Sequence, residues 1–131
     1  MTNTVFEGKL SVALTAADLR RSLKFYTDGL GFVEDQRFED KGALQGVMLS
    51  AGDAHIGLSQ DDFSKGRDRK KGIGCSIYVE TDQDVSALAK HAKEAGVKLS
   101  REAGPLPWGP MGFTAIDPDG FTVTVANRDE G

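Results

Sequence analysis

The sequence predicts an α+β fold made of two copies of a βαβββ module. Three observations lead to this prediction. Strand and helix patterns follow one another in the same order in both halves of the chain, the halves align at nearly constant offsets, and a polar segment separates them. With 131 residues, the chain is long enough for one compact domain with a sizeable core. We therefore expect a single domain, 1–131, with modules at about 8–60 and 73–127 and a polar linker at 61–72.

The first module begins with a strand at 10–15, where apolar and small polar side chains alternate. Asp18 is suited to start the helix that follows, because its carboxylate can accept hydrogen bonds from the free N–H groups of the first turn. The helix stripe expected to face the core consists of Leu19, Leu23, Tyr26 and Leu30, and Gly29 and Gly31 end the helix. Turn residues then separate three strands at 32–39, 44–50 and 54–59.

The second module repeats this order. A strand at 74–79 leads into a helix that begins at Asp82 or Asp84, and a short strand at 97–101 follows. The core stripe of this helix consists of Val85, Leu88, Ala89 and Ala92, and Gly96 ends it. The first strands align at an offset of 63, Ser11 with Gly74, and the helices at an offset of 65, Leu23 with Leu88. An internal duplication explains these matches.

The chain ends on a predicted hairpin with strands at 112–116 and 121–126. Its turn is Asp117-Pro118-Asp119-Gly120, in which the first Asp side chain can accept hydrogen bonds, Pro presets φ and Gly closes the turn. If Ile116 lies opposite Phe121, then Phe113 and Ala115 share a face with Thr122 and Thr124. The loop before the hairpin brings Trp108 over that face.

Composition and charge argue against several classes of function. The net charge of −4 and the pI near 5.1 argue against nucleic-acid binding, and the basic run at 65–71 fits a solvated linker. Apolar runs are far shorter than the ~18 residues of a membrane span, and the first ten residues do not resemble a signal peptide, so we expect a cytoplasmic protein with no membrane contact. The single cysteine, Cys75, excludes an intramolecular disulfide and fits a small buried side chain.

Several segments together resemble the vicinal-oxygen-chelate superfamily, which includes glyoxalase I, extradiol dioxygenases, fosfomycin-resistance enzymes and metal-free bleomycin-resistance proteins. They are the duplicated βαβββ pattern, DLRRSLKFYTDGLGF at 18–32, GDAHIGLS at 52–59 and WGPMGFTAIDPDGFTV at 108–123. The resemblance implies concave mixed sheets with helices on their outer faces, the glyoxalase/bleomycin-resistance fold. It also implies a homodimer whose modules pair across chains to close two pockets. Pairing of the two modules within one chain would satisfy the same strand patterns.

For metal-dependent members, the resemblance implies one ligand, typically His, Gln or Glu, on each of four strands. These positions fall on Ser11, Gly57, Gly74 and Thr124. None of them supplies a carboxylate, imidazole or thiolate for a divalent metal. If the four ligand positions are shifted by one residue on every strand, Cys75 is the only side chain among the new positions that could bind a metal. One thiolate is not a metal site. We therefore expect neither a metal nor another cofactor.

The residues expected to line a ligand cavity are small or hydroxyl-bearing, with aromatic side chains at the rim. We predict ligand binding by Ser11, His55, Ser76, Tyr78, Trp108, Phe113, Thr122 and Thr124, with Ala13 and Ser59 on the same face. Small side chains leave room for an organic molecule, while Trp and Tyr offer large apolar contact areas and can meet a cation. The alternative for Trp108 is a purely structural role, in which its side chain fills an empty half-barrel. His55 fits a polar cavity residue better than a catalytic base, and His91 fits an exposed helix residue.

The sequence favours a metal-free protein that binds a small organic molecule, cationic or aromatic, such as an antibiotic or an aromatic metabolite. In this it is similar to the bleomycin-resistance proteins. An enzyme is the alternative: a lyase, isomerase or dioxygenase-like catalyst with an unconventional metal site or none, using His55 or Tyr78 as its acid–base group. A third interpretation is a structural or regulatory module that binds no ligand.

Overall fold

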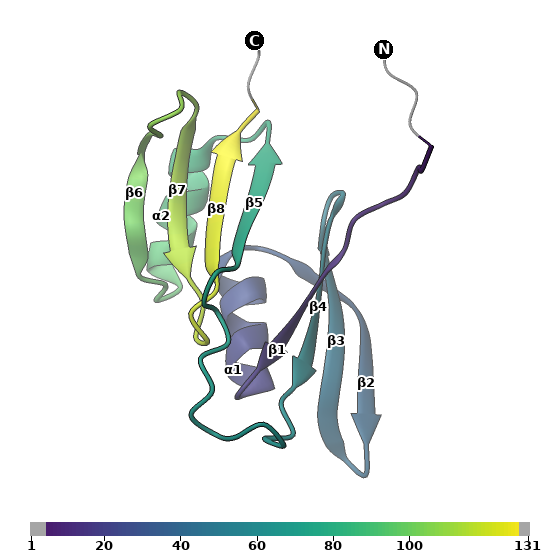
Figure 1. The fold of residues 1–131 in the computed structure, drawn as a ribbon. Helices are drawn as coiled ribbons and strands as arrows, with labels where there is room; N and C mark the ends of the chain where they lie inside the picture. Colours follow the sequence, from purple (N-terminus) through teal and green to yellow (C-terminus); the bar gives the residue numbers. More distant parts are fainter. Residues whose placement is uncertain (1–4, 129–131) are drawn as a thin grey trace.

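The computed structural model describes residues 5–128 and contains two modules with the same order of elements (Figure 1). The first module consists of β1 (Val12–Ala16), α1 (Leu19–Lys24), the π-helical turn η1 (Phe25–Gly29), β2 (Val33–Asp40), β3 (Ala43–Ala51) and β4 (Ala54–Gln60). The second consists of β5 (Ser76–Thr81), α2 (Val85–Glu94), β6 (Leu99–Pro105), β7 (Met111–Ile116) and β8 (Thr122–Asn127). The predicted α+β fold of two repeated modules is confirmed.

Each module forms one four-stranded mixed sheet. The strand order is β1-β4-β3-β2 in the first sheet and β5-β8-β7-β6 in the second. The pairs β1–β4 and β5–β8 are parallel, and the other neighbours are antiparallel. Helix α1 packs on β3 and β4, and α2 packs on β6, β7 and β8, so one face of each sheet is turned toward a helix (Figure 1). We call the opposite face of each sheet its open face.

Both helices begin at capping aspartates. The Asp18 side chain accepts a hydrogen bond from the Arg21 N–H at 3.3 Å, as predicted. The Asp84 side chain accepts one from the Ser86 N–H at 3.0 Å, which decides between the two predicted starts of the second helix. The first helix is not α-helical throughout, because it widens into η1 after Lys24 and ends at Gly29.

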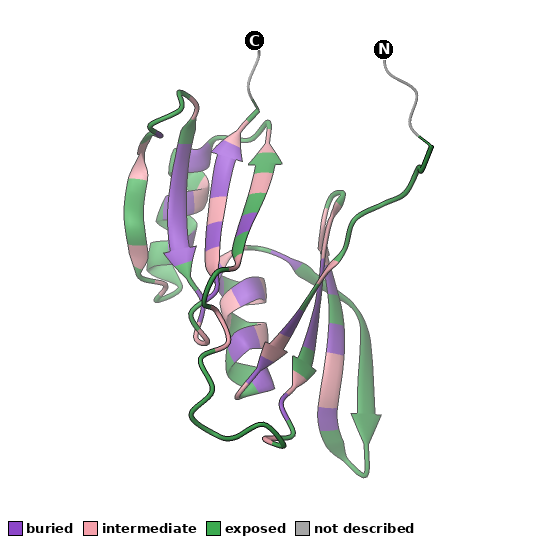
Figure 2. Ribbon diagram, viewed as in Figure 1, coloured by how far each residue is buried: buried purple, intermediate pink, exposed green. Residues whose placement is uncertain are grey.

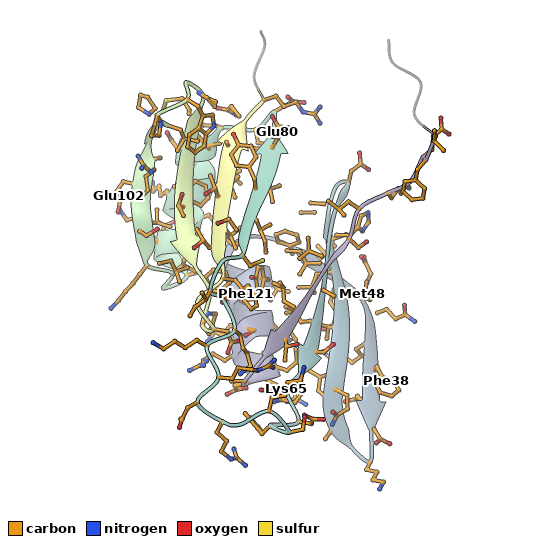
Figure 3. All side chains as sticks on the ribbon, viewed as in Figure 1. Phe38, Met48, Lys65, Glu80, Glu102 and Phe121 are labelled. Atoms are coloured by element: carbon orange, nitrogen blue, oxygen red, sulfur yellow. The ribbon has the colours of Figure 1, made fainter. Side chains whose placement is uncertain are left out.

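The main hydrophobic core joins the two modules. It contains side chains of β1, α1, β3 and β4 together with Ile77, Phe121 and Val123 of the second module. Figure 3 shows Phe121 beside α1, at the end of the second sheet. A smaller cluster of Val85, Ala89, Phe113 and Val125 lies between α2 and the second sheet. Because α1 lies against the first sheet and the end of the second, the two modules pack as one unit.

Two acidic side chains of the β7–β8 turn reach the first module. The buried Asp117 carboxylate accepts a hydrogen bond from the Tyr26 hydroxyl at 2.8 Å and from the N–H groups of Asp119 and Phe121 at 2.8 and 2.9 Å. The Asp119 carboxylate accepts bonds from the Ala17 N–H at 3.1 Å and the Ser22 hydroxyl at 3.3 Å. The turn therefore supplies acceptors to the backbone just before α1 and to hydroxyl side chains of α1 and η1.

The modules meet a second time where α2 approaches η1. A ring nitrogen of His91 lies 2.9 Å from the Asp28 carbonyl oxygen. Gly29 packs so closely on Val97 that an added Cβ would lie 2.5 Å from a Val97 methyl group. His91 is exposed, as predicted, but it also bridges the modules.

The linker at 61–72 is mostly exposed but is held at its ends. Lys71 and Asp61 form an ion pair at 3.0 Å whose side chains are almost completely buried, and Arg69 approaches the same carboxylate at 3.6 Å. Arg67 lies 4.3 Å from the centre of the Phe63 ring. The basic run therefore folds back on its own acidic start.

The structure corrects several predicted positions. Ile116 lies opposite Thr122 rather than Phe121, because residues 117–121 form the loop. The first strand starts at Val12, so Ser11 precedes it, and β5 starts at Ser76, after Gly74 at a φ of +76°. Cys75 is half-buried and packs against the main core.

The outermost strand of the first sheet, β2, is exposed along its whole length (Figure 2). Glu34, Asp35, Glu39 and Asp40 all lie in this strand and give it an exposed acidic surface. No helix among residues 5–128 is long and apolar enough to cross a membrane.

Candidate functional site

The open face of the second sheet carries most of the predicted ligand-binding residues. Side chains that pair directly across neighbouring strands share a face, and Tyr78 pairs with Thr124 while Ser76 pairs with Thr122. Both threonines are half-buried, and Ser76 and Tyr78 are exposed. The neighbouring residues Ile77, Val123 and Val125 point to the helix side and are buried. Because side chains alternate along the strands, the open face of this sheet is polar and the opposite face of the same strands belongs to the core.

Trp108 reaches this face from the loop between β6 and β7. Its indole N–H donates a hydrogen bond to the Tyr78 hydroxyl at 3.0 Å, and the ring centres lie 5.9 Å apart at an interplanar angle of 52°. Despite this contact, Trp108 is 59% exposed and Tyr78 46% exposed. The hydrogen bond fixes the two rings relative to each other while leaving both accessible to a ligand.

Threonines form the floor beside this aromatic pair. The hydroxyl groups of Thr114 and Thr124 lie 2.9 Å apart across β7 and β8. At the loop end of the face, Gly112 has no room for a side chain, because an added Cβ would lie 2.6 Å from Leu106. Leu106 is buried and accepts the N–H of Gly109 on its carbonyl at 2.9 Å, which helps to shape the loop that carries Trp108.

Phe113 does not belong to this face, so its predicted place in the cavity is wrong. It pairs with Val125, is 1% exposed and packs in the smaller core against α2. The error follows from the hairpin register, because a one-residue shift moves a side chain to the other face of the sheet. Phe113 stabilises the helix side of the second sheet instead.

The remaining predicted residues lie on the first sheet. His55 pairs with Ser50 on the open face and is half-exposed, and Ser59 and Ala13 share that face. Ser11 is exposed just before β1. The strands of the two sheets do not pair with each other, and the sheets lie on different sides of α1 (Figure 1). A single chain therefore presents two separate open faces rather than one enclosed cavity.

The residues at the implied metal-ligand positions do not fit a divalent metal. The Thr124 hydroxyl is engaged by Thr114, and a side chain at Gly57 would meet the Met48 sulfur at 3.1 Å. In the second sheet, Ser76 rather than Gly74 is the counterpart of Ser11. Ser11 lies two residues before Ala13, the strand partner of Gly57, and Ser76 lies two residues before Tyr78, the strand partner of Thr124. Within residues 5–128, no group of three or more His, Cys, Asp or Glu side chains could hold a metal ion. Serine, threonine and glycine are poor substitutes for such donors.

Two cavities lie away from the predicted residues. One of about 540 Å³ lies between the linker and the β7–β8 turn, and one of about 400 Å³ lies along α2 and β6. Neither is lined by a residue of the predicted ligand site. An open face that forms half of a composite site would not enclose a cavity in a single chain.

Sequence reasoning missed two charged residues of the second open face. Arg101 pairs with Thr114 and Glu80 pairs with Ala126, which places both on this face. Simple alternation would put Arg101 on the same face as Leu99, but an irregularity between them lets Leu99 pair with Ala115 and Arg101 with Thr114. The face of Arg101 therefore depends on pairing across the sheet, which the sequence pattern does not show.

Burial shifts the pKa values of the Tyr26–Asp117 pair. It raises the pKa of the Tyr26 hydroxyl, and the adjacent Asp117 carboxylate raises it further. Burial also raises the pKa of Asp117, and the hydrogen bonds from Tyr26 and the two N–H groups only partly oppose this. Both groups lie at the junction of the modules, away from the open faces.

Residues 10–125 match the model of the Glyoxalase/Bleomycin resistance protein/Dioxygenase superfamily. Among curated proteins, a probable lactoylglutathione lyase from Vibrio parahaemolyticus is 28% identical over 127 residues, covering 92% of this chain and 91% of that protein. A lactoylglutathione lyase from Arabidopsis thaliana is 25% identical over 127 residues, and the match spans 44% of its length.

Solved structures show the same fold. A glyoxalase I mutant from Zea mays has a TM-score of 0.75 at 25% identity, covering 93% of this chain and 45% of that one. TioX from Micromonospora sp. ML1 has a TM-score of 0.74 at 18% identity, covering 92% of this chain and 98% of that one. At the lower identity, the likeness concerns the fold alone.

Proposed function

The chain belongs to the glyoxalase/bleomycin resistance protein/dioxygenase superfamily, and on this premise we propose that it is a metal-free protein that binds and sequesters a planar aromatic molecule, such as an antibiotic or a metabolite. The observation that carries the proposal is the exposed Trp108–Tyr78 pair, joined by a 3.0 Å hydrogen bond above a floor of threonines. Stacking on aromatic side chains contributes about 0.5–1.5 kcal/mol beyond the burial of apolar area.

The composition of the open face supports binding of an organic ligand. Ser76 and Thr122 offer hydroxyl groups, and all three residues, Ser76, Thr122 and Thr124, occupy little space beside the aromatic pair. Ligand sites of this kind combine apolar and aromatic walls with a few polar groups. At the positions where metal-dependent relatives are expected to hold ligands, this chain has the small residues Ser11, Gly57, Ser76 and Thr124.

A homodimer is part of this proposal. On the first sheet, Phe38 and Met48 are 63% and 42% exposed (Figure 3). Gln36 and Phe38 pair with Met48 and Gly46, which places all four on the open face. If the first sheet of one chain faces the second sheet of another, the two chains close two sites and cover these apolar side chains. Light scattering should give a mass of about twice 14.0 kDa, and a monomer at micromolar concentration would contradict this arrangement.

The ligand-binding proposal can be tested through Trp108, which is the single tryptophan of the chain. A panel of planar aromatic antibiotics and metabolites should include compounds that quench its fluorescence and raise the melting temperature, since ligands of the native state stabilise it. Binding to Trp108→Ala, measured by calorimetry, should be at least several-fold weaker, with Trp108→Phe between the two. If every hit binds the Ala variant as tightly as the wild type, the assignment of Trp108 is wrong.

A second candidate function comes from the curated relative from Vibrio parahaemolyticus, named as a probable lactoylglutathione lyase and matched along nearly its whole length. In that case the chain would form lactoylglutathione. Purified protein should be assayed for this reaction without metal and after addition of nickel, zinc, iron or manganese. Because the residues at the metal-ligand positions are Ser11, Gly57, Ser76 and Thr124, we expect no turnover. Stoichiometric, tightly held metal with turnover would overturn the binding proposal.

A further inference from the structure

The open face of the second sheet has opposite charges at its two edges. Arg101, Thr114, Thr124 and Tyr78 form one row across β6, β7, β8 and β5, because each pairs directly with the next. Glu80 lies one row further along β5, beside Ala126 (Figure 3). In these four strands, Arg101 and Glu80 are the charged residues on this face, since Glu102 pairs with Lys93 on the helix side.

The Arg101 guanidinium is unpaired. Within residues 5–128 it makes no hydrogen bond or ion pair, whereas Arg37, Arg69 and Arg128 each have an acidic partner. The side chain is exposed, so it carries a full charge at the rim of a face otherwise lined with hydroxyl groups and aromatic rings. An arginine that is not needed for folding contacts is available to a ligand.

From this arrangement we propose that Arg101 binds an anionic group of the ligand, whose aromatic part lies on Trp108 and Tyr78; this inference rests on the proposed ligand-binding function. The ligand is then an aromatic anion, with a carboxylate, sulfonate or phosphate, rather than a cation. Three strand spacings separate Arg101 from Tyr78, which is roughly 14 Å between Cα atoms. After the reach of both side chains is subtracted, a system of two or three rings spans the remainder.

The charges also set the direction of binding. A guanidinium can hold a carboxylate or phosphate through two parallel hydrogen bonds, which fixes its position as well as its charge. Glu80 repels an anion at the aromatic edge, so the anionic group is directed to the β6 edge. Between the edges lie Thr114 and Thr124, whose hydroxyl groups bond to each other at 2.9 Å and whose side chains add little bulk.

The test uses two fluorescent probes that differ by one charge. 8-Anilinonaphthalene-1-sulfonate is an aromatic anion, and N-phenyl-1-naphthylamine is the same ring system without the sulfonate. Dissociation constants of both probes should be measured for the wild type, Arg101→Gln, Trp108→Ala and Arg20→Gln. Arg20 is an exposed arginine of α1 with no partner within residues 5–128, so it is the matched control.

We expect Arg101→Gln to weaken binding of the sulfonate about tenfold and to leave the neutral probe unchanged, because a charge-assisted hydrogen bond is lost. Glu80→Gln should tighten the sulfonate alone, and Arg20→Gln should change neither probe. Added salt should weaken the sulfonate more than the neutral probe.

The outcomes separate the inference from the proposed function. If Trp108→Ala weakens both probes but Arg101→Gln weakens neither, the aromatic site stands and the role of Arg101 is wrong. Equal loss of both probes in Arg101→Gln also overturns that role, since the effect would not depend on charge. If neither probe binds the wild type, or Trp108→Ala binds both as the wild type does, the proposed site itself fails.

Discussion

The hairpin turns of the two modules occupy equivalent places in the fold but have opposite surroundings. The β3–β4 turn consists of Gly52 and Asp53 and is exposed, and within residues 5–128 the Asp53 side chain has no hydrogen bond or ion pair. The β7–β8 turn spans 117–121, and its first residue, Asp117, is 4% exposed and bonded to Tyr26 of the first module. One turn is a simple connection between two strands, and the other forms part of the junction between the modules.

The difference shows that a turn motif can have two separate roles. Asp117 closes its own loop, since the Gly120 N–H donates to its carbonyl at 3.0 Å and two further N–H groups donate to its carboxylate. The same carboxylate and that of Asp119 bind donors about one hundred residues earlier in the chain. A local signal therefore determines the turn, while long-range contacts make it essential for stability. The following substitutions test this contrast.

The largest effect is expected for Asp117→Ala. Three donors in or near the core lose their acceptor, and each unsatisfied buried group costs about 1–3 kcal/mol. The free energy of unfolding in urea should fall by about 3 kcal/mol or more. Asp53→Ala, in the equivalent turn, should change it by less than about 0.5 kcal/mol. Similar losses for both variants would remove the distinction between the turns.

Gly72→Ala should have the next largest effect, because the linker passes directly over the β7–β8 turn. An added Cβ would lie 2.1 Å from the Gly120 carbonyl carbon, and this contact is with backbone that cannot rotate away. We expect a loss of about 1–3 kcal/mol. Gly104→Ala is the control, since the nearest atom to its added Cβ would be the Glu102 carbonyl oxygen at 4.0 Å. A Gly72 variant as stable as the wild type would show that the linker and the turn can move apart.

Tyr26→Phe should lower the stability by about 1–2 kcal/mol, because the Asp117 carboxylate loses one of its three donors in a buried site. Tyr78→Phe removes a hydroxyl group from an exposed pair and should cost less than about 0.5 kcal/mol. Thermal and urea unfolding of both variants provide the comparison. If the Tyr78 variant is the less stable of the two, the buried bond is not what joins the modules.

The smallest effect concerns pH. Burial raises the pKa of Asp117 above its value in the unfolded chain, about 3.9. Its contribution to stability is therefore fully present below that value and is lost as the pH rises through the folded-state pKa. Relative to Asp117→Asn, the wild type should lose stability as the pH is raised from 4 toward 7 in urea titrations. A difference that is constant with pH, or that grows in favour of the wild type, would mean that the three hydrogen bonds outweigh burial.

Local sequence patterns were sufficient for most elements. The capping aspartate and apolar stripe located α1, and the period of two located the strands, because these signals depend on residues close together in the chain. The boundaries of β6 and the change from α1 to η1 were not predicted. Both depend on contacts with other elements, since β6 pairs irregularly with β7 and η1 packs against α2.

The candidate site was predicted only in part, for a similar reason. Tyr78, Thr122 and Thr124 follow the alternation of single strands, and they share one face as expected. Phe113 was predicted on the wrong face because the loop 117–121 is one residue longer than the predicted turn. This one-residue shift changes which side chains of β7 share a face with Thr122 and Thr124. Arg101 was missed because its face depends on pairing across the sheet with Thr114.

By itself, the sequence determined the duplicated βαβββ order, the capped helices, the β7–β8 turn and the absence of suitable donors at the implied metal-ligand positions. These are properties of residue types and their spacing. The tertiary structure decided which side chains meet: Tyr26 with Asp117, Trp108 with Tyr78, and Arg101 in line with the threonines. The physical reason is that strand register and module packing bring together residues from 13 to 91 positions apart in these pairs, and no local pattern encodes those distances.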